Sequence, residues 1–374
     1  MIRLLTISHS YVVANNRRLA HEMAVQGRGR WEVTALAPAR LPGDLRDVAL
    51  EPIVGEACTT HGLRMRLGRV PHLRRYDSGL RAHLAGSWDV VHVWEEPYVA
   101  ACAQAAAAPS RARVVPATFQ NIVKTYPPPF SYFERRVMER AAGWVAFGET
   151  VFEAQATKPL YAARPSRVIP PGVDVVGFQP DASARAVIRG RLEWHDDVPV
   201  VGFLGRFVPA KGPGVLMRAL DSIDLPWRAL FVGGGPMAPE LADFSAAHPG
   251  RVRVLTDVDH DCVPEHLNAM DVLCAPSQTT PRWREQFGRM LIEAMACGVP
   301  VIASRSGEIP HVVGDAGLLV DEADVSGWTA AIERMLGDRA LRRNLSARGV
   351  DRAHERYAWP VVALAHLAFF EELL

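Results

Sequence analysis

Short apolar runs alternate with helical patterns along the whole chain, and this alternation constrains the fold more than any other feature of the sequence. The run Leu4-Leu5-Thr6-Ile7, for example, is typical of a strand that is covered on both faces. Such alternation predicts β-α-β units and parallel sheets. In the first half we expect strands at residues 2–8, 32–37, 64–67, 89–93, 113–118, 144–147 and 168–169, and helices at 15–27, 98–108 and 131–142.

The same alternation resumes near residue 199 and fills the second half of the chain. There we expect strands at residues 199–204, 229–232, 252–255, 272–275, 299–303 and 318–320, and helices at 214–220, 239–247, 286–297, 325–336 and 339–355. Residues 170–199 start with Pro170-Pro171-Gly172 and contain a charged helix, which indicates a connection between domains. Because 374 residues are long for one domain, the sequence predicts two doubly wound α/β domains of similar size.

One more helical pattern ends the chain. After Pro360, the apolar residues Val361, Leu364, Leu367 and Ala368 share one helical face. From this pattern alone, the helix could cross back onto the first domain or cap the second. We therefore divide the chain into residues 1–175, 176–356 and 357–374. Two doubly wound domains that face each other form a cleft, and ligands of such sheets bind at the carboxyl ends of the strands.

Composition and charge exclude several classes of protein. Lys and Arg total 42 against 41 acidic residues, a formal net charge of +1, so no nucleic-acid partner is expected. A small anionic ligand remains compatible, because it needs only two or three placed cations. The five cysteines are scattered, which favours free thiols over a disulfide framework or a zinc site. The N-terminus does not resemble a signal peptide and no apolar run approaches the roughly 20 residues of a membrane span, so we expect a cytoplasmic protein.

The start of the second domain carries two cations at a strand end. Gly205 and Arg206 follow the expected strand, and Lys211 precedes the next helix. Arg can bind a phosphate through two parallel hydrogen bonds, and Lys adds a compact charge. The N-terminus of the helix adds its dipole. Lysine occurs only three times in the chain, so its presence here favours a diphosphate site over a solvated surface.

Other strand ends are less specific. The glycine-rich turn Gly233-Gly234-Gly235-Pro236 reads equally well as a structural turn and as the wall of a ligand site. The first strand is not followed by a G-x-G-x-x-G motif, so a dinucleotide site there is weakly supported. Asn15 or Asn16 could cap the helix that follows, or could belong to a polar loop that binds a ligand. His92 is expected to be a buried strand histidine.

Two glutamates flank the most informative stretch of the chain. Glu285 precedes the helix expected at 286–297, and Gly288 lies near its first turn, where free backbone N–H groups can face an anion. Glu293 lies inside this otherwise apolar helix and needs polar partners such as ribose hydroxyls. If both glutamates were helical they would be about 12 Å apart, because a helix rises about 1.5 Å per residue. That is too far for the paired carboxylates of a glycosidase, which lie about 5–9.5 Å apart.

The stretch E-Q-F-G-R-M-L-I-E-A-M-A-C-G-V-P-V-I, with Glu285 and Glu293 eight positions apart, resembles the signature of retaining glycosyltransferase family 4. Gly205-Arg206, Lys211-Gly212, the Gly233–Pro236 turn and Ile169-Pro170-Pro171-Gly172-Val173-Asp174 fall where that family places them. The resemblance covers the second domain strongly and the first more loosely. It implies the GT-B fold, an α/β architecture of two Rossmann-like, doubly wound domains facing a cleft, with a C-terminal helix that crosses back to the first domain.

The resemblance also implies a site and a reaction. The donor would be a nucleotide-diphosphate sugar, with no metal and no further cofactor, and its hexosyl group would pass to an acceptor hydroxyl with retention. Arg206 and Lys211 would hold the diphosphate, Glu293 the ribose, and Val258 the base through its backbone. Glu285, counted among the catalytic residues with Arg206, Lys211 and Gln120, would hold the donor hexose and the β-phosphate together with the backbone of residues 287–290. The remaining substrate-binding residues of the second domain would be Gly205, Gln286, Phe287, Gly288, Arg289 and Met290. In the first domain, Asn15 and Asn16 are the substrate-binding candidates, on the polar-loop alternative given above.

One departure from the family concerns proton transfer. Many members carry a His in the loop after the strand expected at 113–118, whereas Gln120 takes that position here. Gln can hydrogen-bond a sugar hydroxyl but cannot act as a general base, so the proton must go elsewhere, for example to the leaving phosphate. The run Q-N-I-V-K-T-Y-P-P-P-F resembles the subgroup that builds bacterial exopolysaccharide or lipopolysaccharide.

The acceptor side of the first domain is rich in arginine. These residues form either a solvated face or a docking surface for a lipid-linked acceptor or the inner membrane surface. They are Arg64, Arg66, Arg69, Arg74, Arg75, Arg81, Arg135, Arg136 and Arg140. Two other functions stay open on the same fold: a nucleotide-sugar epimerase, and a protein that binds sugar nucleotides without catalysis.

Overall fold

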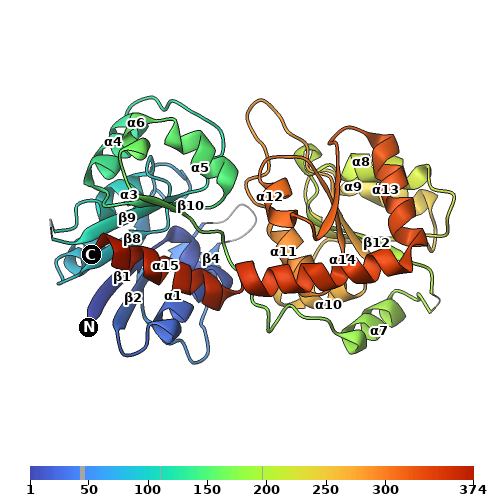
Figure 1. Ribbon diagram of the computed structural model, residues 1–374, viewed down its shortest axis with the longest axis horizontal. Coiled ribbons are helices and arrows are strands. Elements are labelled where there is room, and N and C mark those ends of the chain that lie inside the picture. The colour runs from blue at the N-terminus through green and yellow to red at the C-terminus, as the bar shows by residue number, and fades with distance from the viewer. Residues whose placement is uncertain (43–46, 110, 196) are drawn as a thin grey trace. The chain divides into compact units, whose positions relative to one another are not determined.

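The structure is a computed structural model that describes residues 1–42, 47–109, 111–195 and 197–374. Residue 196, inside the connection expected at 170–199, lies outside the described residues. The chain divides into two compact units, residues 1–172 with 359–374, and residues 173–358. We call them unit 1 and unit 2 and describe each by itself (Figure 1).

Unit 1 is built on a parallel seven-stranded sheet in the order β11-β10-β9-β8-β1-β2-β5. The strands are β1 (Ile2–Ile7), β2 (Trp31–Pro38), β5 (Thr59–Leu63), β8 (Val90–Val93), β9 (Arg113–Thr118), β10 (Trp144–Ala146) and β11 (Ser166–Val168). Two short antiparallel pairs accompany it, β3 (Arg40–Leu41) with β4 (Val48–Ala49) and β6 (Met65–Arg66) with β7 (Arg75–Tyr76). The helices are η1 (His9–Val12), α1 (Ala14–Gln26), α2 (Ser78–Leu84), α3 (Ala100–Ala105), α4 (Phe130–Arg140), α5 (Glu149–Ala156), α6 (Pro159–Ala162) and α15 (Trp359–Leu373).

Unit 2 repeats this plan with a parallel six-stranded sheet in the order β14-β13-β12-β15-β16-β17. The strands are β12 (Val200–Arg206), β13 (Arg228–Gly234), β14 (Val252–Leu255), β15 (Val272–Ala275), β16 (Val301–Ser304) and β17 (Gly317–Val320). The α-helices are α7 (Ala182–Arg191), α8 (Pro213–Asp221), α9 (Ala238–Ala247), α10 (Val263–Asn268), α11 (Arg289–Ala296), α12 (Ile309–Val313), α13 (Val325–Gly337) and α14 (Arg339–Arg352). Single turns are η2 (Pro209–Lys211) and η3 (His260–Cys262), and η4 (Ala353–Tyr357) is a π-helical turn.

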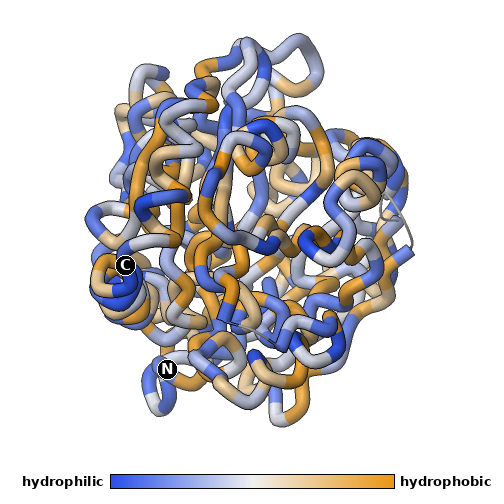
Figure 2. The backbone as a smooth tube through the Cα atoms, turned by 90° about the vertical axis from the view of Figure 1, so that its right-hand side faces the viewer, coloured by the Kyte–Doolittle hydropathy of each residue, from blue (hydrophilic) through white to orange (hydrophobic). Residues whose placement is uncertain are grey.

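Both faces of each sheet are buried, which explains the apolar strands. Leu4 packs with residues of α1 and α15, while its neighbour Leu5 packs on the opposite face with residues of α2 and α3. In unit 2, Val200 packs in the core on one face of the sheet and Val201 in the core on the other. In Figure 2, hydrophobic and hydrophilic stretches alternate along the chain, as expected when strands are covered and loops are exposed.

The last helix packs in unit 1, beside α1 (Figure 1). Trp359 and Phe370 of α15 are buried in the core that Leu19 and Met23 of α1 share with the sheet. A Cβ on Gly172 would lie 2.4 Å from the ring of Trp359, so the chain passes close to the start of α15. The expectation that the final helix returns to the first domain is therefore confirmed.

Several sequence-based boundaries were wrong. The helix expected at 286–297 begins only at Arg289, so Glu285 is not helical and the 12 Å estimate for its separation from Glu293 does not apply. The strand expected at 64–67 is not part of the main sheet. The strand that joins the sheet there is β5, which ends at Leu63, whereas β6 pairs with β7. The charged helix α7, expected within residues 176–356, lies in unit 2, where Ile188 is part of a core. Within the described part of the chain, no helix is long and apolar enough to cross a bilayer.

Candidate functional site

An ion pair forms the centre of the candidate site in unit 2. Lys211, at the end of η2, places its Nζ 2.5 Å from Oε2 of Glu285. Ser277 donates its hydroxyl to the same oxygen at 2.8 Å. The ammonium also lies 5.1 Å from the ring centre of Trp283, within the range of a cation–π interaction. Glu285 is 5 % exposed, so its charge depends on these partners.

Two glycines allow the loops of this site to approach each other. Gly212 has a φ of 72°, and a Cβ there would lie 1.9 Å from the carbonyl oxygen of Pro276. Gly307 has a φ of 52°, and a Cβ there would lie 2.0 Å from the carbonyl oxygen of Glu285. That oxygen accepts a hydrogen bond of 3.0 Å from the amide of Glu308. Only glycine fits these positions, and both contacts fix the backbone around the ion pair.

Arg206 ends β12 and is exposed. Among the residues that the structure describes, its guanidinium has no hydrogen-bond or ion-pair partner, so it is available to an anion. Gly205 and Gly233 lie side by side in the paired strands β12 and β13, followed by Arg206 beside Gly234. The glycine-rich turn thus lies directly beside Arg206, and a Cβ on Gly233 would lie 1.8 Å from the carbonyl oxygen of Gly205, so the close approach of the two strands requires glycine there.

The N-terminus of α11 supplies backbone donors. Its N-cap is Gly288, with a φ of 85°, and the amides of Arg289 and Met290 follow in the first turn, where a helix leaves N–H groups unpaired. Burial lowers the pKa of the Arg289 guanidinium. Phe287 is buried against the ring of Tyr357, with ring centres 5.7 Å apart, and Gln286 is exposed. The first-turn amides therefore follow Gly288, as expected, although the helix itself begins at Arg289 and not at residue 286.

Glu293 lies further along the same helix, α11, and is 7 % exposed. Its carboxylate lies 3.5 Å from Nε2 of His260, and this interaction raises the pKa of His260 above its ordinary value. The chain thus supplies a polar partner for Glu293 that the sequence did not indicate. Val258, two residues before His260, is half-buried against the unit 2 core that also contains residues of α11.

The site residues expected in the first domain all lie in unit 1. The prediction that Asn15 or Asn16 caps α1 was wrong, because the N-cap is Val13 and both residues lie inside the helix. Asn16 instead donates from its side-chain amide to the carbonyl oxygen of Ser10 at 3.2 Å. His92 is fully buried and hydrogen-bonds Thr6 at 3.0 Å, as expected of a strand histidine.

Gln120 follows β9 and is buried. Its side-chain oxygen accepts a 3.2 Å hydrogen bond from the amide of Ile122, and its backbone oxygen accepts one of 2.6 Å from Gln155. Glu96 braces the same loop by accepting from the Thr118 hydroxyl and the Phe119 amide, both at 2.8 Å. Burial raises the pKa of Glu96 to about 7, although these hydrogen bonds lower it.

Sequence reasoning missed Ser277, Gly307 and His260. Ser277 could have been found, because it lies two residues after Ala275, the last residue of β15, at the carboxyl end of the sheet. Nothing in the sequence connects Gly307 to Glu285 or His260 to Glu293. Among the described residues, no group of three or more His, Cys, Asp and Glu side chains is arranged to hold a metal ion.

Comparison with known families and proteins matches the part of unit 2 that contains the candidate site. Residues 198–338 match the family described as Glycosyl transferases group 1. A D-inositol 3-phosphate glycosyltransferase from Xylanimonas cellulosilytica is 35 % identical over 246 residues, which cover 62 % of this chain and 58 % of that protein. A GDP-mannose-dependent alpha-(1-6)-phosphatidylinositol monomannoside mannosyltransferase from Mycolicibacterium smegmatis is 37 % identical over 202 residues, 51 % of this chain and 52 % of that protein. The chain therefore spans little more than half the length of these relatives.

Solved structures match over the full length of the chain. Sucrose-phosphate synthase from Thermosynechococcus elongatus superposes with a TM-score of 0.74 at 22 % identity, covering 100 % of this chain and 99 % of that one. HepE from Anabaena, solved in complex with UDP, gives a TM-score of 0.73 at 18 % identity and covers both chains completely. At these identities the likeness shows the fold alone. The expected two-domain fold and the resemblance drawn from the motifs are both confirmed.

Proposed function

Because residues 198–338 match the glycosyl transferases group 1 family and the whole chain has the GT-B fold, we propose that this protein is a retaining glycosyltransferase. It moves a hexosyl group from a nucleotide-diphosphate sugar to an acceptor hydroxyl. The observation that carries the proposal is the arrangement around Lys211 in unit 2. There the ammonium of Lys211 and the guanidinium of Arg206, which is unpartnered among the described residues, lie at and just after the carboxyl end of β12, and the first turn of α11 adds free amides.

This arrangement suits the chemistry of glycosyl transfer. Breaking the bond between the sugar and the β-phosphate leaves negative charge on the diphosphate and positive character on the sugar. Cations fixed beforehand at the phosphate stabilise that transition state more than the ground state. Lys211 and Arg206 supply this charge without a metal, and Glu285, which orients Lys211, binds the donor hexose. Glu293 holds the ribose, and the acceptor attacks from the face that the diphosphate leaves.

The names of relatives support a nucleotide-sugar donor. The mannosyltransferase from M. smegmatis is named as GDP-mannose-dependent, and HepE was solved with UDP and UDP-glucose. The relatives named for inositol phosphate and phosphatidylinositol act on acceptors that carry a phosphate. We extend this to the present chain as an anionic, lipid-linked acceptor in the synthesis of a cell-surface glycan, used at the cytoplasmic face of the membrane.

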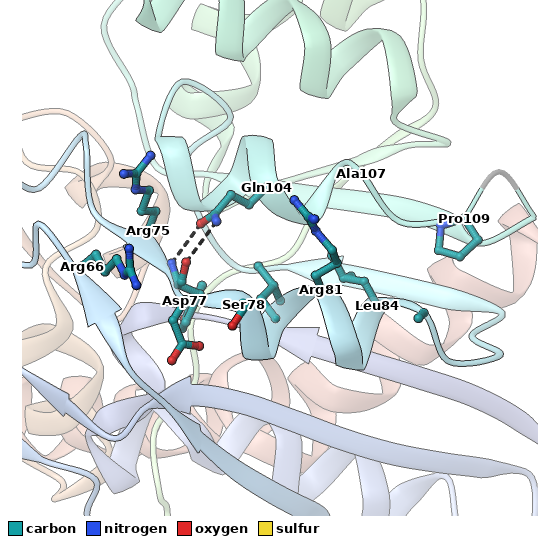
Figure 3. A pocket seen from close by; sticks show the side chains of 12 residues that line it. Arg66, Arg75, Asp77, Ser78, Arg81, Leu84, Gln104, Ala107 and Pro109 are labelled. Atoms are coloured by element: carbon teal, nitrogen blue, oxygen red, sulfur yellow. Dashed lines mark hydrogen bonds between the residues drawn. The ribbon is translucent and has the colours of Figure 1, made fainter.

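A cavity in unit 1 supports an anionic acceptor. It measures about 670 Å³ and lies between β6, β7, α2 and α3 (Figure 3). Arg66, Arg75 and Arg81 line it, and all three are exposed and have no hydrogen-bond or ion-pair partner within the described ranges. Gln104 fixes the wall by bonding both the amide and the carbonyl of Tyr76, at 2.9 and 3.0 Å. The three guanidinium groups outnumber the single carboxylate of Asp77, so the cavity favours phosphate.

The function is tested by calorimetry with UDP-glucose, GDP-mannose and ADP-glucose. We expect one of them to bind, and Arg206→Ala to weaken its binding at least about 10-fold through the loss of a charge-assisted contact. Arg191→Ala, which removes an exposed arginine at the end of α7, is the matched control and should bind as the wild type does. Binding of none of the three sugars would argue against the proposal.

Product analysis separates the remaining functions. Turnover of the bound sugar to a new nucleotide-sugar without any acceptor would identify an epimerase. Binding without turnover in the presence of membrane extract would identify a protein that only binds sugar nucleotides. An α-linked product from an α-configured donor, assigned from the anomeric proton by NMR, would support retention, and a β-linked product would overturn it.

A further inference from the structure

A histidine of unit 2 lies against the single carboxylate of helix α11. Glu293 stands among buried apolar residues of this helix and is 7 % exposed. Within the described residues its carboxylate forms no hydrogen bond, and its one ion pair joins Oε1 to Nε2 of His260 at 3.5 Å. A carboxylate so nearly buried needs a polar partner, and the apolar helix offers none. His260 therefore supplies the interaction that Glu293 lacks on its own helix.

The position of His260 is fixed by its own turn and by an aromatic neighbour. His260 begins η3, which is closed by a 2.9 Å hydrogen bond from the amide of Cys262 to the carbonyl oxygen of Asp259. The ring of Phe178, buried in a unit 2 core, has its centre 5.8 Å from that of His260. The side chain of His260 is nonetheless 50 % exposed. The imidazole can therefore exchange a proton with water while it stays beside Glu293.

The contact leaves most of the carboxylate open to a ligand. A carboxylate has about four lone-pair positions on its two oxygens. His260 approaches one oxygen only, and 3.5 Å exceeds the roughly 2.7–2.9 Å of a close charge-assisted hydrogen bond. The two hydroxyls of a ribose can therefore bind Glu293 without displacing the histidine. A nucleoside that covers this site removes water from Glu293, and a neighbouring positive charge then becomes more important.

The titratable groups around His260 lie on its own turn and on the two helices beside it. They are Asp261 of η3, Glu265 and His266 of α10, and Arg289 and Glu293 of α11. The interaction with Glu293 raises the pKa of His260, while burial and Arg289 lower it and Asp261 raises it. Within the described ranges, Glu293 is the only one of these groups that forms an ion pair with the imidazole.

We propose that protonated His260 positions Glu293 for the ribose of the donor and so strengthens donor binding. His260 is a positioning residue, because it acts through Glu293 and not on the reacting atoms. The inference rests on the proposed function, which assigns the ribose to Glu293. Because protonation and donor binding favour each other, the protein takes up part of a proton when the donor binds near neutral pH. Donor affinity therefore rises as His260 becomes protonated.

The first test needs no ligand. The full-length protein, labelled at histidine, is titrated by NMR, and His260→Gln assigns the resonances of His260. We expect the pKa of His260 to lie above its ordinary value of about 6.5 and to fall in Glu293→Gln. An ordinary pKa that Glu293→Gln leaves unchanged would overturn the proposal, whatever the protein binds.

The second test is calorimetry at pH 6 and pH 8 with UDP-glucose, GDP-mannose or ADP-glucose, whichever the wild type binds. The diphosphate of a sugar nucleotide keeps its charge over this range, so a change in affinity reports groups of the protein. We expect the wild type to bind about 5-fold more tightly at pH 6, as for a half-exposed ion pair. His260→Gln should bind at pH 6 as weakly as the wild type does at pH 8. The pH dependence should also vanish with the 2′,3′-dideoxy form of the same ligand, which a merely structural role would not predict.

His266→Gln is the matched control, because His266 lies on the neighbouring α10 and has no carboxylate partner in the part of the chain that the structure describes. It should keep the wild-type affinity at both pH values. Wild-type behaviour of His260→Gln, or a wild-type affinity that weakens toward pH 6, would overturn the inference while the proposed function stands. Failure of the wild type to bind any of the three sugar nucleotides would refute the proposed function, and the inference with it.

Discussion

Nζ of Lys211 lies 2.5 Å from Oε2 of Glu285, a residue 74 positions later in the chain. The pair connects the turn after β12 to the loop before α11, the two segments that carry the cations and the amides of the candidate donor site. The ion pair therefore has two separable roles. It balances the charge of a nearly buried carboxylate, and it positions an ammonium at the proposed diphosphate.

The first prediction separates these roles. We expect Lys211→Met to destabilise the fold by about 2 kcal/mol, below the roughly 3–5 kcal/mol of a fully buried pair, because Lys211 keeps some contact with water. Donor turnover should fall at least about 100-fold, since the charge at the leaving group is lost. Urea unfolding and the release of nucleoside diphosphate measure the two effects.

The double variant Lys211→Met/Glu285→Gln is the control. It removes both charges, so most of the lost stability should return while turnover stays low. If turnover returned together with stability, the ion pair would serve the fold alone, and the assignment of Lys211 to the diphosphate would be wrong.

The second prediction concerns the close approach of two loops in unit 2. Gly212→Ala should cost about 3 kcal/mol or more, because it combines a strained φ with a Cβ that overlaps the backbone of Pro276. Gly190→Ala is the comparison, since it lies in α7, is exposed, and a Cβ there would meet no atom within 4 Å. This change should stabilise the protein by about 0.5–1 kcal/mol. Equal effects in chemical denaturation would show that Gly212 is not constrained by Pro276.

The third prediction is a pH dependence that arises from Glu96. Its folded pKa of about 7 lies above the ordinary value of 4.5, so the folded protein keeps a proton that the unfolded chain has released. The stability that Glu96 contributes is complete below about pH 4.5 and falls by up to about 1.4 kcal/mol per pH unit until about pH 7. Above that pH the contribution is absent.

Glu96→Gln tests this directly, because Gln imitates the neutral acid toward Thr118 and Phe119. The difference in unfolding free energy between Glu96→Gln and the wild type should change with pH over that window and be constant above it. The variant should be the more stable of the two at about pH 8. A difference independent of pH would mean that Glu96 is ionised throughout.

The fourth prediction concerns the helix that ends the chain. Phe370 is fully buried in unit 1, whereas Leu364 on the same helix is 50 % exposed. Phe370→Ala should cost about 3–5 kcal/mol, and Leu364→Ala less than about 1 kcal/mol. Hydrogen exchange should show the loss of protection in α1, which packs beside α15. Loss confined to unit 2 would contradict the assignment of this helix.

Local patterns predicted the architecture well and the boundaries less well. The continuous apolar runs of β1 and β12 predicted strands covered on both faces, and the order of strands and helices predicted both parallel sheets. The start of α11 was placed too early because Gly288, in a left-handed conformation, ends the preceding loop rather than lying inside the helix. Val13 is the N-cap of α1 although the asparagines nearby are better capping residues, and the carboxylate of Glu51 accepts from the first helical amide, that of Ala14, at 2.7 Å.

The candidate site likewise contains residues that could be predicted from the sequence and residues that could not. Arg206, Lys211 and Glu285 could be singled out because cations and acids are conspicuous at strand ends. Their partners could not, since Ser277, His260 and Gly307 reach them through packing between distant segments. Lys158, for which the sequence indicated no role, forms an ion pair of 2.8 Å with Glu134 in unit 1.

The sequence by itself determined two parallel α/β units, two cations and a glycine at a strand end, and a family resemblance carried by a few motifs. The tertiary structure decided which charges are paired and which are available: Lys211 is held by Glu285, Arg206 is unpartnered among the described residues, and His9 is held by Glu95. The reason is physical. The periodicity of apolar residues records burial along one segment, whereas a hydrogen bond between distant residues depends on how the segments pack, and no local pattern encodes that.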